Sequence, residues 1–127
     1  MKKSLIFTLT VFFLMSLNIL FFPIESEARN IERASVDNSG GEGDGGSIYP
    51  SISSNGRYVA FDSNATNLVA GDTNARGDVF VYDRDTDTIE RVSVNNSGVQ
   101  GNDGSYNPSI SSDGRYVAFG GTPGILH

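Results

Sequence analysis

The chain has 127 residues, and its 9 Lys and Arg against 15 Asp and Glu give a net charge of −6. A nucleic-acid surface needs a basic patch that releases phosphate counterions, so we expect no nucleic-acid partner. The sequence contains no cysteine. Disulfides, thiolate zinc sites and a cysteine nucleophile are therefore excluded, and packing and hydrogen bonds must hold the fold without a covalent staple.

The first 28 residues have the pattern of a secretory signal peptide. Two lysines follow Met1, residues 5–22 are apolar apart from a few Ser, Thr and Asn, and Ser26-Glu27-Ala28 is a small-x-small cleavage site. We expect cleavage after Ala28 and an extracytoplasmic location, either secreted or periplasmic. The alternative is an uncleaved membrane anchor, because the apolar run is near the roughly 18 residues at which a span becomes possible. A membrane contact is expected only in that case.

After the signal segment the chain becomes rich in Gly, Ser, Asn and Asp, which suits many short strands joined by turns. Residues 31–36 are the first expected strand. Residues 37–47 form a Gly-rich loop with nothing apolar to bury. Ordering this loop is expected to contribute only an entropic cost.

A twelve-residue motif follows at residues 50–61 and returns, with one Asn replaced by Asp, at residues 108–119. Asn55-Gly56 and Asp113-Gly114 are strong hairpin signals, because a type I′ turn needs positive φ at both central residues. The apolar run that follows the turn, residues 58–61, is expected to be a strand covered on both faces. Each copy therefore predicts two strands and a tight turn.

Between the two copies, residues 63–77 form a long connection. Residues 78–83, Asp-Val-Phe-Val-Tyr-Asp, are a compact apolar strand, and residues 88–94 are the last strand before the motif returns. Arg57 and its equivalent Arg115 are expected to pair with loop carboxylates. Tyr58 and its equivalent Tyr116 are expected to pack between repeats.

Residues 33–63 and 91–121 are two copies of one segment at an offset of 58 (91 − 33), with 20 of 31 aligned positions identical. A four-stranded unit repeated at a fixed period is typical of a propeller blade, whose small sheet buries its faces against its neighbours. We therefore predict an all-β, β-propeller-type repeat over residues 29–121. It comprises one complete four-stranded blade and half of a second, not closed as a single chain, followed by an irregular tail at residues 122–127.

The motif and the segment Asp-Val-Phe-Val-Tyr-Asp resemble the WD-like repeat of TolB-type β-propellers over residues 31–121. The resemblance implies an exported scaffold, since such repeats serve many exported proteins. Asp87 stands where related sequences often have Gly, so the turn there is expected to be longer or strained. Propellers need about four to eight blades. The chain is thus expected to be a truncated member or fragment, or to need self-association or a partner chain to complete the propeller.

Asp72, Asn74 and Asp78 resemble part of a calcium loop, in which oxygen ligands at alternate positions surround a hard cation. The pattern departs at Arg76, whose charge stands where the third ligand should be, and at Asp83, which replaces the usual closing Glu. The other interpretation is that these side chains hold the turns of a long loop. Calcium is the one cofactor that the sequence suggests.

Catalysis finds little support in the sequence. The single histidine, His127, is the last residue, and no Gly-x-Ser-x-Gly elbow occurs. We predict a non-enzymatic binding module that contacts a protein or surface ligand through loops at the blade ends. Two alternatives stay open: a remnant of the propeller domain of an exported hydrolase, and a calcium-dependent structural module.

Overall fold

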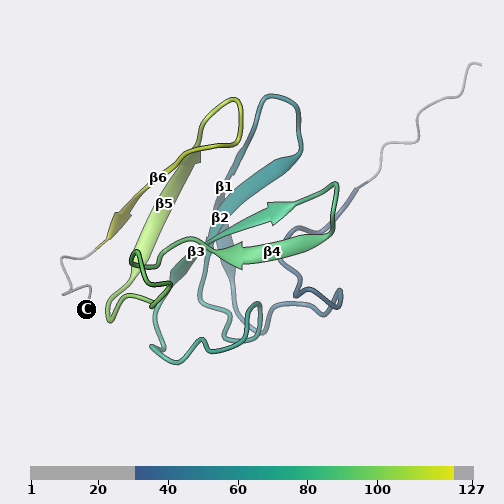
Figure 1. Cartoon of the computed structure of the whole chain (residues 1–127). Coiled ribbons are helices and arrows are strands. Elements are labelled where there is room, and N and C mark those ends of the chain that lie inside the picture. The colour runs from purple at the N-terminus through teal and green to yellow at the C-terminus, as the bar shows by residue number, and fades with distance from the viewer. Residues whose placement is uncertain (1–30, 122–127) are drawn as a thin grey trace, which may run out of the picture. The chain divides into compact units, whose positions relative to one another are not determined.

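The computed structural model describes residues 31–121, and its six strands lie in the compact unit Glu32–His127. A four-stranded antiparallel sheet contains, in sequence order, β1 (Ser47–Ile52), β2 (Tyr58–Ser63), β3 (Asp78–Asp83) and β4 (Thr88–Arg91). The antiparallel pair β5 (Ser105–Ile110) and β6 (Val117–Gly121) forms a second sheet (Figure 1). The predicted all-β fold, with one complete blade-like sheet and half of a second that does not close, is confirmed.

The predicted signal or anchor segment and the tail at residues 122–127 lie outside the described residues. Within residues 31–121, no helix has the length and apolar character needed to cross a membrane.

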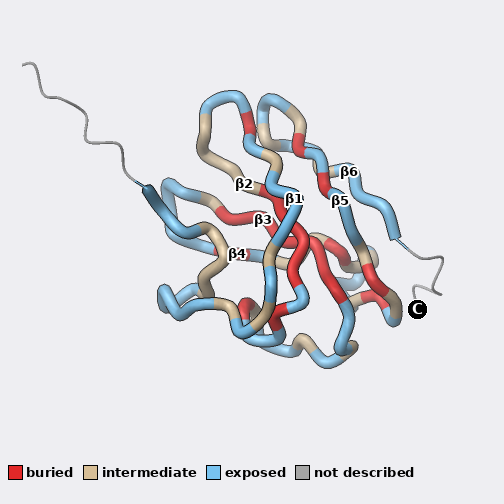
Figure 2. Tube along the Cα trace, turned by 180° about the vertical axis from the view of Figure 1, so that it is seen from behind, coloured by how far each residue is buried: buried red, intermediate tan, exposed pale blue. Residues whose placement is uncertain are grey.

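Strand β2 is covered on both faces, as predicted, because its side chains alternate between two cores. Val59 and Phe61 face a loop-side core, and the Phe61 ring stacks on Phe80 with 6.0 Å between ring centroids. Tyr58 and Ala60 face an inter-sheet core between the two sheets. The buried residues follow β2 and β3 in Figure 2. The loop-side core consists of Phe61, Ala65, Leu68, Phe80, Tyr82 and Ile89, and the inter-sheet core of Ala60, Val81 and Ile110.

Polar contacts also join the two repeats. The backbone N–H of Ser54 donates to the carbonyl of Ser112 at 3.0 Å, so the two hairpin tips are bonded to each other. At the other end of the strands, the backbone N–H of Asn107 donates to the buried carboxylate of Asp62 at 2.9 Å. The second sheet is therefore fixed on the first at both ends of β5.

The hairpin turns differ from the predicted type I′. The carbonyl of Ser53 accepts the N–H of Gly56 at 2.9 Å, and Gly56 has a φ of +73°, but Asn55 does not have a positive φ. The side-chain oxygen of Asn55 accepts the N–H of Arg57 at 3.1 Å, a local bond that competes with the left-handed conformation at Asn55. The turn is therefore a type I-like turn that ends in a left-handed glycine, and the second hairpin repeats it at Gly114, with a φ of +74°.

The strand predicted at residues 31–36 is wrong. Only Val36 forms an isolated bridge, to Glu42, and Ile31 is fully exposed. Residues 31–33 are the repeat equivalents of residues 89–91 in β4, but no strand equivalent to β3 lies beside them in the described part of the chain. A strand pattern without a ladder partner leaves its backbone groups to water. The strand predicted at residues 88–94 ends at Arg91 for a related reason, since Val94 bridges to Gln100 instead.

The Gly-rich loop at residues 37–47 is held by hydrogen bonds. The carboxylate of Asp44 accepts the backbone N–H and the hydroxyl of Thr66 at 2.6 and 2.7 Å, and these bonds lower the pKa of Asp44. At Gly45 the backbone comes so close to Ala65 that an added Cβ would lie 2.6 Å from its backbone nitrogen. Polar bonds and close packing therefore offset the entropic cost of ordering this loop.

Strands β1 and β5 each contain an irregularity in register, before Pro50 and Pro108 respectively. Tyr49 and Asn107, the residues that precede these prolines, have φ values of +51° and +55°. The two repeats thus share the same strained bulge at the same position.

Candidate functional site

Two residues of the predicted calcium loop, Asp72 and Asp78, lie beside the guanidinium group of Arg91, and the third, Asn74, contacts Asp78. Its Nη1 atom lies 3.6 Å from Oδ1 of Asp72 and 3.6 Å from Oδ2 of Asp78, and these three side chains are 9%, 3% and 0% exposed. Asn74 donates through Nδ2 to Oδ2 of Asp78 at 3.1 Å. Two buried carboxylates thus share a cation that the chain itself supplies.

Further hydrogen bonds fix this cluster on the sheet. Oδ1 of Asp78 accepts the hydroxyl of Ser93 at 2.7 Å. Nη1 of Arg91 donates to Oε1 of Gln100 at 2.7 Å, and Nε2 of Gln100 donates to the hydroxyl of Thr73 at 2.6 Å. The arrangement ties the long connection to β3, to β4 and to the segment that leads into β5.

The electrostatic balance of the cluster is unequal. Burial raises the pKa of Asp72, the nearby charge of Asp78 raises it further, and Arg91 opposes both effects. Oδ1 of Asp72 and Nε of Arg91 have no hydrogen-bond partner in the described part of the chain. Asp72 is therefore the group in the cluster whose charge is least compensated.

Sequence reasoning did not place Arg91 and Gln100 beside the predicted calcium loop, although the duplication carried a signal for them. Their equivalents in the first copy are Arg33 and Glu42, which form an ion pair at 2.8 Å. No group of three or more His, Cys, Asp or Glu side chains that could hold a metal occurs within residues 31–121. The calcium loop stays a prediction, and any ion there would compete with the guanidinium group.

A different feature distinguishes the second repeat: identical residues in the two copies differ strongly in exposure. Phe61 is 3% exposed, whereas its equivalent Phe119 is 40% exposed. Ala60 is fully buried, but Ala118 is exposed. The cause is the sheet order, because β2 lies between β1 and β3 whereas β6 pairs only with β5 in the described chain.

We call the exposed residues Tyr116, which precedes β6, Ala118 and Phe119 the β6 surface. Because strand side chains alternate, Tyr116 and Ala118 lie on one face and Phe119 lies on the other, so the three flank the free edge of β6. Tyr116 is 67% exposed, whereas its equivalent Tyr58 is half-buried and packs against the inter-sheet core. The predicted packing of these tyrosines between repeats is thus confirmed for Tyr58 and wrong for Tyr116. The reason is that, within residues 31–121, no third sheet packs on the sheet of β5 and β6 and covers Tyr116.

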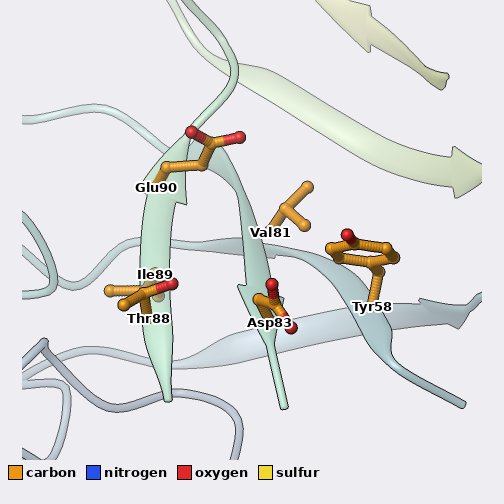
Figure 3. A pocket seen from close by; sticks show the side chains of 6 residues that line it. All are labelled: Tyr58, Val81, Asp83, Thr88, Ile89 and Glu90. Atoms are coloured by element: carbon orange, nitrogen blue, oxygen red, sulfur yellow. The ribbon is translucent and has the colours of Figure 1, made fainter. Parts of the chain in front are cut away.

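Close to the inter-sheet core, the four-stranded sheet carries an open concavity of about 290 Å³ (Figure 3). The cross-strand pairs Tyr58 with Asp83 and Val81 with Glu90 place these side chains on one face of the sheet. Val81 also belongs to the inter-sheet core, so this is the face that carries the second sheet. The residues that line the concavity are Tyr58, Val81, Asp83, Thr88, Ile89 and Glu90.

The two equivalent arginines also differ. Arg57 binds the carboxylate of Asp83 at the end of β3 through Nε and Nη2, at 2.8 and 2.7 Å. These hydrogen bonds lower the pKa of Asp83 to about 2. Both arginines lie over the ring of the tyrosine that follows them, at 4.9 Å for Arg57 and 5.8 Å for Arg115. No carboxylate of residues 31–121, however, pairs with Arg115. The predicted pairing with a carboxylate is confirmed for Arg57 and wrong for Arg115, because the strand that would supply the carboxylate is not beside β6.

Comparison with protein-family models, with curated proteins and with solved structures gave no match. The resemblance to TolB-type propellers therefore stays a prediction.

Proposed function

We propose that the chain is a non-enzymatic, exported interaction module that binds a protein partner through the β6 surface. The observation that carries the proposal is the exposure of side chains in the second repeat whose identical counterparts in the first repeat are buried. An unpaired strand edge that is flanked by exposed apolar side chains is a place where another chain can pair. Covering a large apolar side chain contributes about 1.5–3 kcal/mol.

A protein partner suits this surface better than a small molecule does. The exposed apolar groups lie along a strand and beside its free edge, so they offer a long, shallow contact instead of an enclosed site. The loops at the blade ends, which the sequence suggested as the binding elements, carry polar side chains that bond one another, such as Asp44 and Thr66. We therefore place the proposed contact on β6.

Site-specific photo-crosslinking in the source cells tests the proposal. A photoreactive residue at Phe119 should give an adduct with one defined protein. The same residue at Val99, which is 50% exposed but lies outside the β6 surface, should not. Equal labelling from both positions, or none from Phe119, would refute the proposal that the chain binds a partner through the β6 surface.

Export is supported by the basic start, the apolar run and the cleavage pattern of residues 1–28. Mass spectrometry of the chain recovered from the extracytoplasmic fraction should find a protein that begins at Arg29. A full-length chain in the membrane fraction would support the uncleaved anchor. A chain confined to the cytoplasm would exclude the signal peptide and the anchor alike.

A further inference from the structure

We propose that the free edge of β6 accepts a β-strand from the partner protein, and that this strand has the pattern of β3, Asp-Val-Phe-Val-Tyr-Asp. The inference rests on the proposed function, because it gives the chemistry of the partner at the same surface. The chain contains its own template for the complex. Strand β2 is the repeat equivalent of β6, and β2 pairs with β3 in an antiparallel register from Tyr58 opposite Asp83 to Ser63 opposite Asp78.

The edge of β6 is suited to strand addition. In the described part of the chain β6 has β5 on one side and no strand on the other, so one row of backbone donors and acceptors is unpaired. Residues 117–121 contain no proline and no charged residue, the devices with which edge strands usually block pairing. An extended segment placed there would gain a ladder of backbone hydrogen bonds, as in other cases of strand addition.

Charge complementarity fixes one end of the added strand. In the template, Arg57 holds the last residue of β3, Asp83, in a two-point contact at 2.7 and 2.8 Å. Arg115 is the same residue in the second copy, and it lacks such a carboxylate within residues 31–121. The template register places the last Asp of the added strand opposite Tyr116 and next to Arg115. Paired N–H donors on a planar guanidinium recognise a carboxylate with high directional selectivity.

Aromatic packing fixes the middle of the strand. Phe61 lies opposite Phe80 in the template, and the two rings stack with an interplanar angle of 28°. Phe119 is the equivalent of Phe61, and its exposed fraction of 40% leaves room for an aromatic ring from the added strand. The Phe at the third position of the pattern supplies that ring.

The donor is a different protein and not a second copy of this chain. The matching segment of a second copy is its own β3, an interior strand with β2 on one side and β4 on the other. Donating β3 would require that copy to open its four-stranded sheet and expose the fully buried Val79 and Phe80.

Peptide binding to the purified full chain tests this inference. The probe is a synthetic peptide with the sequence of residues 77–84, Gly-Asp-Val-Phe-Val-Tyr-Asp-Arg, labelled through a soluble tail, and a scrambled peptide is the control. Fluorescence anisotropy should show saturable binding of the probe and none of the scrambled peptide. Replacing the second Asp of the peptide by Asn should weaken binding about tenfold or more, with no change to the folded chain.

Variants of the chain test the register. Arg115→Ala should weaken the Asp peptide about as much as the Asn substitution does, and the two changes together should add no further loss. Arg76→Ala removes the same charge from an exposed position and should leave binding unchanged. Equal effects of the two arginine variants would overturn the assigned register.

Absence of saturable binding would overturn the strand-acceptor inference. If crosslinking at Phe119 still gives its single adduct in that case, the interaction module stands and only the strand is refuted. If light scattering finds a dimer that the peptide does not dissociate, a second copy is the occupant and the inference fails.

Discussion

Replacing Phe61 by alanine should lower the free energy of unfolding by about 3–5 kcal/mol, the range for a fully buried phenylalanine. The same change at its equivalent Phe119 should cost about 1–2 kcal/mol. Phe61 is 3% exposed and stacks on Phe80, so its removal leaves a closed cavity. Phe119 is 40% exposed. Phe119→Ala therefore loses about three fifths of the roughly 1.5–3 kcal/mol that burial of a whole side chain contributes. A gap that is open to solvent adds little to this loss.

Urea unfolding followed by far-ultraviolet circular dichroism measures both values on the same chain. The two variants have the same change in composition, so their difference, about 1–4 kcal/mol, reports only the surroundings of the two rings. If Phe61→Ala is unfolded in water, Phe61→Leu keeps apolar volume and should retain a measurable transition. Equal losses at the two positions would refute the reasoning, because they would mean that the second repeat is as enclosed as the first.

Three further outcomes follow from the polar contacts. Because Arg57 lowers the pKa of Asp83 from 3.8 to about 2, the melting-temperature difference between wild type and Arg57→Ala should be full at pH 7 and shrink as the pH falls from 3.8 towards 2; a constant difference would contradict this. Burial and the hydrogen bond to Asp87 raise the pKa of Tyr82 from 10.0 to about 12, so wild-type stability should fall as the pH rises through this range. Tyr82→Phe should abolish that fall, at a cost of about 0.5–1.5 kcal/mol at neutral pH. Calcium and its removal by chelator should leave the melting temperature unchanged, because the guanidinium group of Arg91 already lies beside both carboxylates and would have to be displaced, whereas a calcium effect that Asp72→Asn abolishes would support the calcium loop.

Local patterns predicted the strands whose neighbours are also in the chain. Residues 78–83 form β3 with the predicted bounds, because an apolar run between two carboxylates is buried on both faces only as an interior strand. The predicted strain at Asp87 is present as well, with a φ of +54°. The same reasoning failed at residues 31–36, where the pattern is equally good but no neighbouring strand is present in the described chain.

The candidate site was harder to predict, because its key contacts join residues far apart in the sequence. The residues around Asp72 in the sequence give no sign that Arg91 lies close to it and to Asp78. Arg91 reaches this position only because β4 pairs with β3. The type of the hairpin turn was missed for the opposite reason, because it depends on one local hydrogen bond, from the backbone N–H of Arg57 to the side-chain oxygen of Asn55. The β6 surface could be recognised only by comparing the burial of two copies whose sequences are the same.

The strand edges differ in how well they are protected against pairing with other chains, and this difference affects the solubility of the protein. The outer edge of β1 carries Pro50 and a bulge, and β4 carries the exposed charge of Glu90. The outer edge of β6, by contrast, presents Ala118, Phe119 and Gly120 without any such device. Preparations of the chain alone should therefore precipitate as they are concentrated, and a strand peptide or partner that covers the edge of β6 should keep them clear. The proposed partner would give this edge the protection that proline, the bulge and charge give the other two.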